Sequence, residues 1–180
     1  MTFRMINKGR VMACAFGIVL SACAGPRVGD YAAQGPALDI REYFRGPVEA
    51  HGIVTDRSGR VTRRFTVQMD CRWNGDEGVL DEHFVYSDGA TQSRSWRMQR
   101  QADGRYVGRA DDVVGVAIGE EGGFAFRMQY TLAVPVDGRV WDLQFDDWMY
   151  RIDQHSVINR AVMSKFGLRV GEITVVFSRA

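Results

Sequence analysis

The sequence has little cysteine, little net charge and no apolar run long enough to cross a membrane as a helix. Of its three cysteines, Cys14 and Cys23 lie in an N-terminal segment treated below, and Cys71 stands alone in the remainder, which therefore holds no internal disulfide. Cys71 continues an apolar row at every second residue with Phe65, Val67 and Met69. This spacing predicts a buried, unreactive thiol.

Several functional classes lack their sequence signature. The formal net charge is +1, so nothing predicts the basic face of a nucleic-acid-binding protein. The histidines, His51, His83 and His155, share no spacing typical of a metal site. The G-x-S-x-G motif is absent, and the glycines from Gly115 to Gly123 lack the Lys-Ser/Thr of a phosphate-binding loop. We expect no cofactor, no metal and no nucleic-acid partner.

The N-terminus carries the most specific signal. Three basic residues precede the ten-residue apolar run Val11 to Leu20, followed by Leu20-Ser21-Ala22-Cys23. Ten apolar residues are too few for a membrane-spanning helix and are typical of a secretory signal. The sequence L-S-A-C resembles the lipobox of bacterial lipoproteins, which implies a signal peptide over residues 1–22 and an acylated Cys23. By the same resemblance, Ala24 indicates sorting to the outer membrane.

Removal of this signal would leave 20 of the 23 basic residues against 22 acidic ones, a net charge of −2. Residues 23–36 are rich in Gly, Ala and Pro without periodicity, which predicts a flexible tether. The following segment, Pro36 to Phe44, has apolar residues at helical spacing and predicts one or two helical turns that plug the domain.

From Gly46 onward the sequence predicts a β-meander. Turn dipeptides recur about every fifteen residues, at Ser58-Gly59, Asn74-Gly75, Asp88-Gly89, Asp103-Gly104, Gly122-Gly123 and Asp137-Gly138. Such pairs favour tight hairpins because they tolerate positive φ. Apolar and polar residues alternate between them, as in Phe65 to Trp73 and Phe124 to Val134. We expect residues 37–180 to form one all-β domain, an antiparallel up-and-down, lipocalin-like barrel of about eight to ten strands.

Two other architectures share this alternation. A two-sheet sandwich needs longer crossover connections than the sequence provides. A transmembrane barrel alternates short turns with long loops, whereas all reversals here are short. The closed soluble barrel, with room inside for side chains or one small ligand, is the preferred interpretation.

The stretch from Val140 to Asp153 is the most aromatic in the chain and breaks its own pattern. Trp141, Leu143, Phe145 and Met149 share one face of an extended strand, and Asp147 falls in the same row. A buried carboxylate is costly unless it is paired. Either a partner inside the barrel must bind it, or a β-bulge must turn it outward.

Four segments resemble a family of bacterial lipoproteins known as domain of unknown function 3833. They are Phe44 to Gly52, Asp111 to Gly119, Asp146 to Tyr150, and Asn159 to Gly167 followed by Gly171 to Thr174. The resemblance implies a lipocalin-type barrel and a lipid-related role, but it carries over no catalytic residue.

Charged residues of the C-terminal third could form a single cluster, of which the members are Asp146, Asp147, Asn159, Arg160, Lys165 and Glu172. We consider a structural ion-pair network, a site in which Arg160 or Lys165 binds a fatty-acid or phospholipid anion, and a catalytic carboxylate. The aromatic residues expected to line the interior or its mouth include Trp141, Trp148, Phe126 and Tyr130.

We therefore expect a lipid-anchored periplasmic protein, held at a bacterial outer membrane through Cys23, that binds or carries an apolar fatty-acyl or lipid ligand. One alternative is a lipid-modifying enzyme with Asp147 or Glu172 as general base beside Arg160. The other is an envelope scaffold with a filled interior. The ligand-binding residues of the preferred hypothesis are Asp147, Arg160, Lys165, Glu172, Trp141, Trp148, Phe126 and Tyr130.

Overall fold

The computed structural model describes residues 25–136 and 138–179. These residues form two short helices and ten strands: η1 (Val28–Tyr31), α1 (Ile40–Tyr43), β1 (Gly46–Asp56), β2 (Val61–Asn74), β3 (Glu77–Tyr86), β4 (Thr91–Arg100), β5 (Tyr106–Arg109), β6 (Ala117–Gly122), β7 (Ala125–Val136), β8 (Arg139–Arg151), β9 (Ser156–Lys165) and β10 (Leu168–Ser178). The expected signal peptide and Cys23 lie outside the described residues. Within the described ranges, no helix has the length and apolar character needed to cross a membrane.

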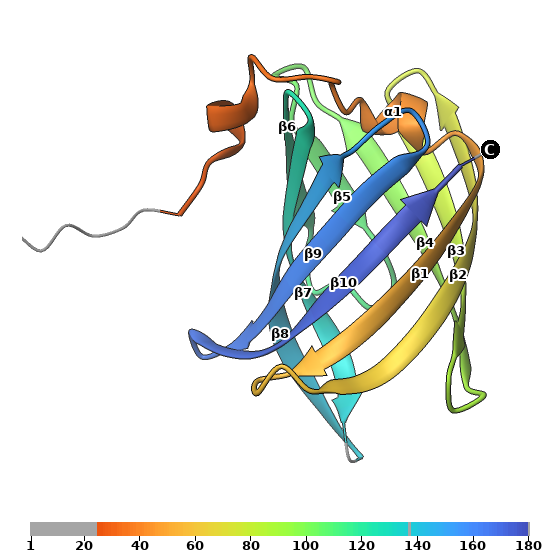
Figure 1. The fold of residues 1–180 in the computed structure, drawn as a ribbon, viewed down its shortest axis with the longest axis vertical. Coiled ribbons are helices and arrows are strands. Elements are labelled where there is room, and N and C mark those ends of the chain that lie inside the picture. Colours follow the sequence, from red (N-terminus) through yellow and green to blue (C-terminus); the bar gives the residue numbers. More distant parts are fainter. Residues whose placement is uncertain (1–24, 137, 180) are drawn as a thin grey trace, which may run out of the picture.

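The ten strands close into an antiparallel barrel in which each strand pairs with its sequence neighbours (Figure 1). β1 closes the ring by pairing with β10, from Glu49 opposite Ser178 to Asp56 opposite Gly171. The predicted all-β, up-and-down barrel of about eight to ten strands with a short N-terminal helix is confirmed. Ring closure leaves no sheet edge unpaired at the first and last strands.

The predicted reversals lie between consecutive strands. Gly59, Gly75, Gly89, Gly104 and Gly123 each have φ between +55° and +86°, a region that residues with a Cβ rarely adopt. The turn between β9 and β10 differs, because Phe166, which is not a glycine, has φ +52° and precedes Gly167 at +76°.

The strands are less uniform than the expected ten residues each. β5 and β6 are short and pair only near one end of their neighbours, with β5 opposite Arg97 to Arg100 of β4. The intervening segment, Ala110 to Val116, lies against β7 through a bridge between Val113 and Leu132. Gly115 lies in this segment with φ +79°.

Most apolar side chains point into the barrel and most charged ones point out of it. In β2, Phe65, Val67, Met69, Cys71 and Trp73 are buried while the residues between them are exposed. This is the reverse of a membrane-spanning barrel, whose outer face is apolar. Burial also raises the pKa of the Cys71 thiol to about 12, as expected for an unreactive core cysteine.

The short helix α1 covers one end of the barrel, called the plugged end here (Figure 1). Asp39 caps it by accepting a hydrogen bond from the backbone N–H of Arg41. Ile40, Tyr43 and Phe44 are buried in the main core, and the Trp73 indole N–H donates to the Phe44 carbonyl at 2.9 Å. The predicted helical plug is therefore present.

Part of the segment 23–36, expected to be a flexible tether, is docked on the barrel, while most of its described residues are exposed. Residues Val28–Tyr31 form η1, which packs on the outer face of the barrel, where Val28 contacts a cluster with Ala125 and Trp148. Tyr31 packs edge-on against Trp148 and Tyr150. Aromatic contacts, which composition alone did not reveal, hold this Gly- and Ala-rich segment in place.

Tyr43→Phe tests whether the hydrogen bonds of the Tyr43 hydroxyl hold α1 on the plugged end. The Tyr43 hydroxyl donates to the carbonyls of His155 at 2.8 Å and Phe177 at 3.1 Å. Loss of these buried bonds should lower the free energy of unfolding by about 1–2 kcal/mol in urea titrations. The control is Tyr86→Phe, which removes a bond to Gln92 in a more exposed position and should change stability by less than about 0.5 kcal/mol. Equal effects of the two substitutions would contradict the fastening role.

Candidate functional site in the barrel interior

The two halves of the barrel interior differ in packing. Near the plugged end, inward side chains such as Tyr106, Phe126 and Val157 are at most 2% exposed. Toward the opposite end, called the mouth, apolar side chains in inward-facing positions are only partly buried: Val54, Phe84, Tyr86, Val134, Leu143, Met163 and Ile173. Water therefore reaches an apolar inner wall in the mouth half.

Asp147 lies inside the barrel, where its carboxylate accepts hydrogen bonds from two side chains. The Tyr130 hydroxyl donates to one carboxylate oxygen at 2.9 Å, and the Asn159 amide donates to the other and to the Trp148 carbonyl. The pairing of β7 with β8 runs without a register shift from Ala125 opposite Tyr150 to Val136 opposite Arg139. Of the two possibilities left open by the sequence, the internal partner is correct.

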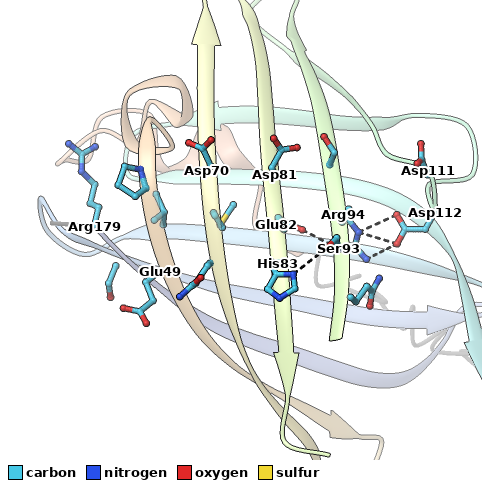
Figure 2. Close-up of a pocket in the computed structure, with 17 residues that line it drawn as sticks. Glu49, Asp70, Asp81, Glu82, His83, Ser93, Arg94, Asp111, Asp112 and Arg179 are labelled. Carbon is cyan, nitrogen blue, oxygen red and sulfur yellow. Dashed lines mark hydrogen bonds and ion pairs between the residues drawn. The ribbon is translucent and has the colours of Figure 1, made fainter. Parts of the chain in front are cut away.

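A second polar group faces inward from β3, β4 and the segment after β5. Glu82 and Arg94 are direct neighbours in the β3–β4 ladder, with 3.7 Å between Oε2 and the guanidinium. Arg94 also forms a bidentate pair with Asp112, with contacts between 2.7 and 3.2 Å. Figure 2 shows Arg94 between the two carboxylates.

Both groups contain a carboxylate with a raised pKa. Desolvation by burial raises the pKa of Glu82 to about 7, and the charges of Asp112 and Asp147 act in the same direction against Arg94. Desolvation also raises the pKa of Asp147 to about 6, although its bonds from Tyr130 and Asn159 oppose this. Near neutral pH, the interior can therefore take up or release protons.

Together, Glu82, Arg94, Asp112, Tyr130, Asp147 and Asn159 form what we call the interior polar cluster. It holds three carboxylates and one guanidinium, and that guanidinium already has two acidic partners. Desolvation and the Asp147 charge raise the pKa of Tyr130 well above its usual value, so its hydroxyl stays protonated and donates. The cluster can accept hydrogen bonds or exchange protons, but it repels an added anion.

Four of the sequence-predicted residues lie outside the barrel. Arg160 faces outward and pairs with Glu172 at 2.7 Å, a contact that lowers the pKa of Glu172. Trp148 also faces outward, under η1, with the Arg127 guanidinium 5.0 Å above its ring. Asp146 pairs with Arg127 on the same face. The expected single charged cluster is therefore divided by the barrel wall.

The other predicted residues line the interior or the mouth. Phe126 is buried against Tyr106 toward the plugged end, and Tyr130 stacks on Phe145 at 5.0 Å. Lys165 lies at the mouth, where its ammonium donates to the Asp142 carbonyl at 2.7 Å and lies 5.7 Å from the Trp141 ring. The interior thus keeps Asp147, Phe126 and Tyr130, and the mouth keeps Lys165 and Trp141.

A family model described as protein of unknown function (DUF3833) matches residues 17–179. This chain belongs to the DUF3833 family. A search of curated proteins gives no match.

Within this DUF3833 chain, sequence analysis missed three members of the interior polar cluster. Glu82 falls in the row of Leu80 and Phe84, so the alternation of β3 contained its signal. Arg94 precedes Trp96 by two residues, so the inward row of β4 contained its signal. Asp112 gave no periodic signal, because it lies in an irregular segment. In the described ranges, no group of three or more His, Cys, Asp or Glu residues could hold a metal ion.

Two surface hollows lie outside the interior. An open groove of about 1260 Å³ runs over β1 to β4, and its lining includes the outward-facing Asp70, Asp81, His83 and Ser93 (Figure 2). A smaller hollow of about 620 Å³ lies over β10, β1, β2 and β3. Arg94 and Asp112 also line the larger groove, so their ion pair forms part of the barrel wall.

The raised pKa of Glu82 predicts a specific dependence of stability on pH. Folded Glu82 holds its proton up to about pH 7, whereas a Glu in the unfolded chain loses it near pH 4.5. The folded state then binds more protons, so the free energy of unfolding should fall as pH rises from about 4.5 to about 7. Asp147 contributes in the same direction only up to about pH 6.

Glu82→Gln should therefore remove the fall in the free energy of unfolding between pH 6 and 7. It should also raise that free energy at pH 8 by about 1 kcal/mol or more. Urea titrations at pH 5, 6, 7 and 8 would measure both effects. Glu172→Gln is the matched control, because the pKa of Glu172 is lowered and its titration ends below pH 6. An unchanged slope in Glu82→Gln would show that Glu82 is ionised in the folded protein at pH 6.

Proposed function

We propose that this protein is a lipid-anchored periplasmic carrier that binds a fatty-acyl or similar lipid ligand in the mouth half of its barrel. The proposal rests mainly on the partly accessible apolar wall inside that half. A wall of β7 to β10 joins the buried Leu132 and Phe145 to the partly buried Leu143, Met163 and Ile173. Apolar surface that remains in contact with water favours an acyl chain as its occupant.

The charges of the interior favour one orientation of the ligand. The interior polar cluster repels an anionic headgroup, because its only guanidinium is already paired twice. At the mouth, by contrast, Lys165 supplies positive charge, whereas Arg63, stacked 3.6 Å above the Tyr86 ring, is paired with Asp88 at 2.8 Å. An acyl chain would therefore lie inside with its anionic head at the mouth, close to Lys165.

Localisation is part of the same proposal. The lipobox-like Leu20 to Cys23 supports export and acylation at Cys23, and Ala24 supports an outer-membrane address. Acylation would hold the carrier beside a source of lipid. Mass spectrometry of the full chain purified from its own membranes would detect a lipid-modified N-terminal Cys23, and an unmodified N-terminus would contradict the anchor.

Native mass spectrometry of the same preparation tests the carrier directly. A lipid should co-purify and survive gentle transfer to the gas phase. Met163→Gln places a polar group of similar size on the inner wall and should weaken binding of a fluorescent fatty acid about tenfold, equivalent to about 1.4 kcal/mol. Ile158→Gln is the matched control on the outer face of the same strand. If neither protein binds a lipid, the filled-scaffold alternative gains support.

One observation favours a lipid-modifying enzyme as the second candidate. Glu82 has a pKa of about 7, close to that of an efficient general acid or base, and its Oε2 atom has no hydrogen-bond partner. Glu172, the base suggested by the sequence, is instead held outside the barrel by Arg160. Turnover of a bound lipid that is lost in Glu82→Gln while binding persists would establish the enzyme over the carrier.

A further inference from the structure

Two neighbouring hairpins at the mouth expose large apolar side chains to water. Phe166 and Leu168, at the β9–β10 turn, are 84% and 67% exposed, and Val140, beyond the β7–β8 turn, is 68% exposed. Trp141 and Val136 are also exposed. These five residues form what we call the rim patch. Isolated apolar residues on a surface are ordinary, but several gathered on adjoining hairpin tips mark a contact surface.

Lys165 joins the two hairpins into one surface. Its ammonium donates to the Asp142 carbonyl on β8 and lies 4.9 Å from the Phe166 ring and 5.7 Å from the Trp141 ring. Arg139 and Arg169 add two further positive charges at the same tips. The acids there are Asp142, Glu172, which pairs with Arg169 at 3.1 Å, and Asp137 in the turn sequence.

The conformation of Phe166 shows that folding alone does not explain this residue. It occupies the left-handed region at φ +52°, where Asn, Asp or Gly is favoured and a bulky residue is disfavoured. Four other hairpins of the barrel place Ser, Asn or Asp before the turn glycine, at Ser58, Asn74, Asp88 and Asp103. An exposed phenylalanine in this position contributes little to packing, so we assign its role to an external contact.

A lipid surface fits the rim patch better than a protein pocket does. The patch is convex, since its residues sit on projecting hairpin tips (Figure 1), and a bilayer interface can deform around a convex apolar tip. Aromatic and aliphatic side chains flanked by Lys and Arg are typical of segments that enter the headgroup region of anionic membranes. Long basic side chains reach the phosphates while the apolar groups are buried.

η1 docks near the plugged end, where Trp148 pairs with Arg160, six residues or about 20 Å along β9 from Phe166. β8 and β9 lead from there to the rim patch. In Figure 1 the described chain begins on the side toward which the β9–β10 turn projects. Cys23 precedes the docked Val28 by five residues, which reach about 18 Å when extended. A chain extended toward the mouth spans most of the distance to the rim patch, so an acyl chain on Cys23 and the rim patch could enter one bilayer.

We propose that the rim patch docks on the anionic phospholipid membrane that holds the acylated N-terminus, with Phe166 and Leu168 in the headgroup region and Arg139, Lys165 and Arg169 against phosphates. The direction of approach rests on the anchor of the proposed function, whereas the patch itself does not. Docking sets the mouth beside the bilayer, so a lipid can pass between membrane and barrel with little exposure to water.

The test uses the full chain carrying Leu168→Cys, labelled with a polarity-sensitive fluorophore and reconstituted in vesicles of phosphatidylglycerol and phosphatidylcholine. Val85→Cys is the control label, 44% exposed on β3, three strands away from β10 around the ten-stranded ring. The unsubstituted chain reports background labelling, which the burial of Cys71 should keep low. Nitroxide-bearing phospholipid quenches a label in the bilayer, and iodide quenches a label in water.

We expect nitroxide lipid to quench the label at position 168 several-fold more than the label at 85, and more in vesicles with phosphatidylglycerol than without it. Phe166→Asn should weaken the quenching while the stability of the fold stays equal or rises, because Asn suits the turn. A label at 168 that iodide quenches as freely as the label at 85 overturns the proposal. The proposal is also overturned if neither iodide nor nitroxide lipid quenches the label at position 168, since a protein would then cover the patch.

The two proposals fail in different ways. If Cys23 is not acylated, the protein leaves the membrane fraction regardless of the rim patch. If the docking is wrong, the protein stays in the membrane fraction with an unquenched label at 168. Lipid binding to the interior, measured by native mass spectrometry, is independent of both outcomes.

Discussion

The structure depends on one ion pair that completes the barrel wall. β5 and β6 are too short to extend along β4 and β7 toward the mouth, so the mouth half of β4 pairs with β3 on one side but has no described ladder on its β5 side. The bidentate contact between Arg94 and Asp112 spans this seam. The Arg94 guanidinium is partly desolvated in this contact. The charged pair of Arg94 and Asp112 therefore lies beside Glu82 in a mostly apolar interior.

The water-accessible part of the apolar inner wall lies in the mouth half. At the plugged end, aromatic rings lie directly on glycines: a Cβ at Gly119 would meet the Phe126 ring at 2.5 Å, and one at Gly78 would meet Trp73 at 2.6 Å. Rings that fill the space of missing side chains leave the plugged half solid. The raised pKa values of Glu82 and Asp147 arise where this solid half meets the accessible one, because water there is too restricted to solvate two carboxylates fully.

Sequence periodicity predicted the closed barrel, its reversals and the plug, and it left two possibilities for Asp147, an internal partner or a bulge that turns it outward. The alternation of faces along a strand also predicts the direction of Arg160. Asn159 shares the inner face with Val157 and Ala161, so Arg160 between them points outward. The seam was not predictable, because it results from where β5 ends, and the sequence Tyr106–Arg109 carries no stop signal stronger than its neighbours. The docking of η1 depends on Trp148 facing outward, which is a property of the folded barrel.

The distribution of charge links the interior to the membrane. A carrier that placed a carboxylate beside Arg94 would have to break the bond to Asp112 that closes the wall, so uptake of a headgroup would open the barrel. Placing the head at Lys165 leaves the wall intact and keeps the charged end of the ligand among lipid headgroups. The same lysine contacts Trp141 and Phe166, so the site proposed for the headgroup and the surface proposed for the bilayer share one cation. Transfer between them would then require no movement of a charge into the apolar interior.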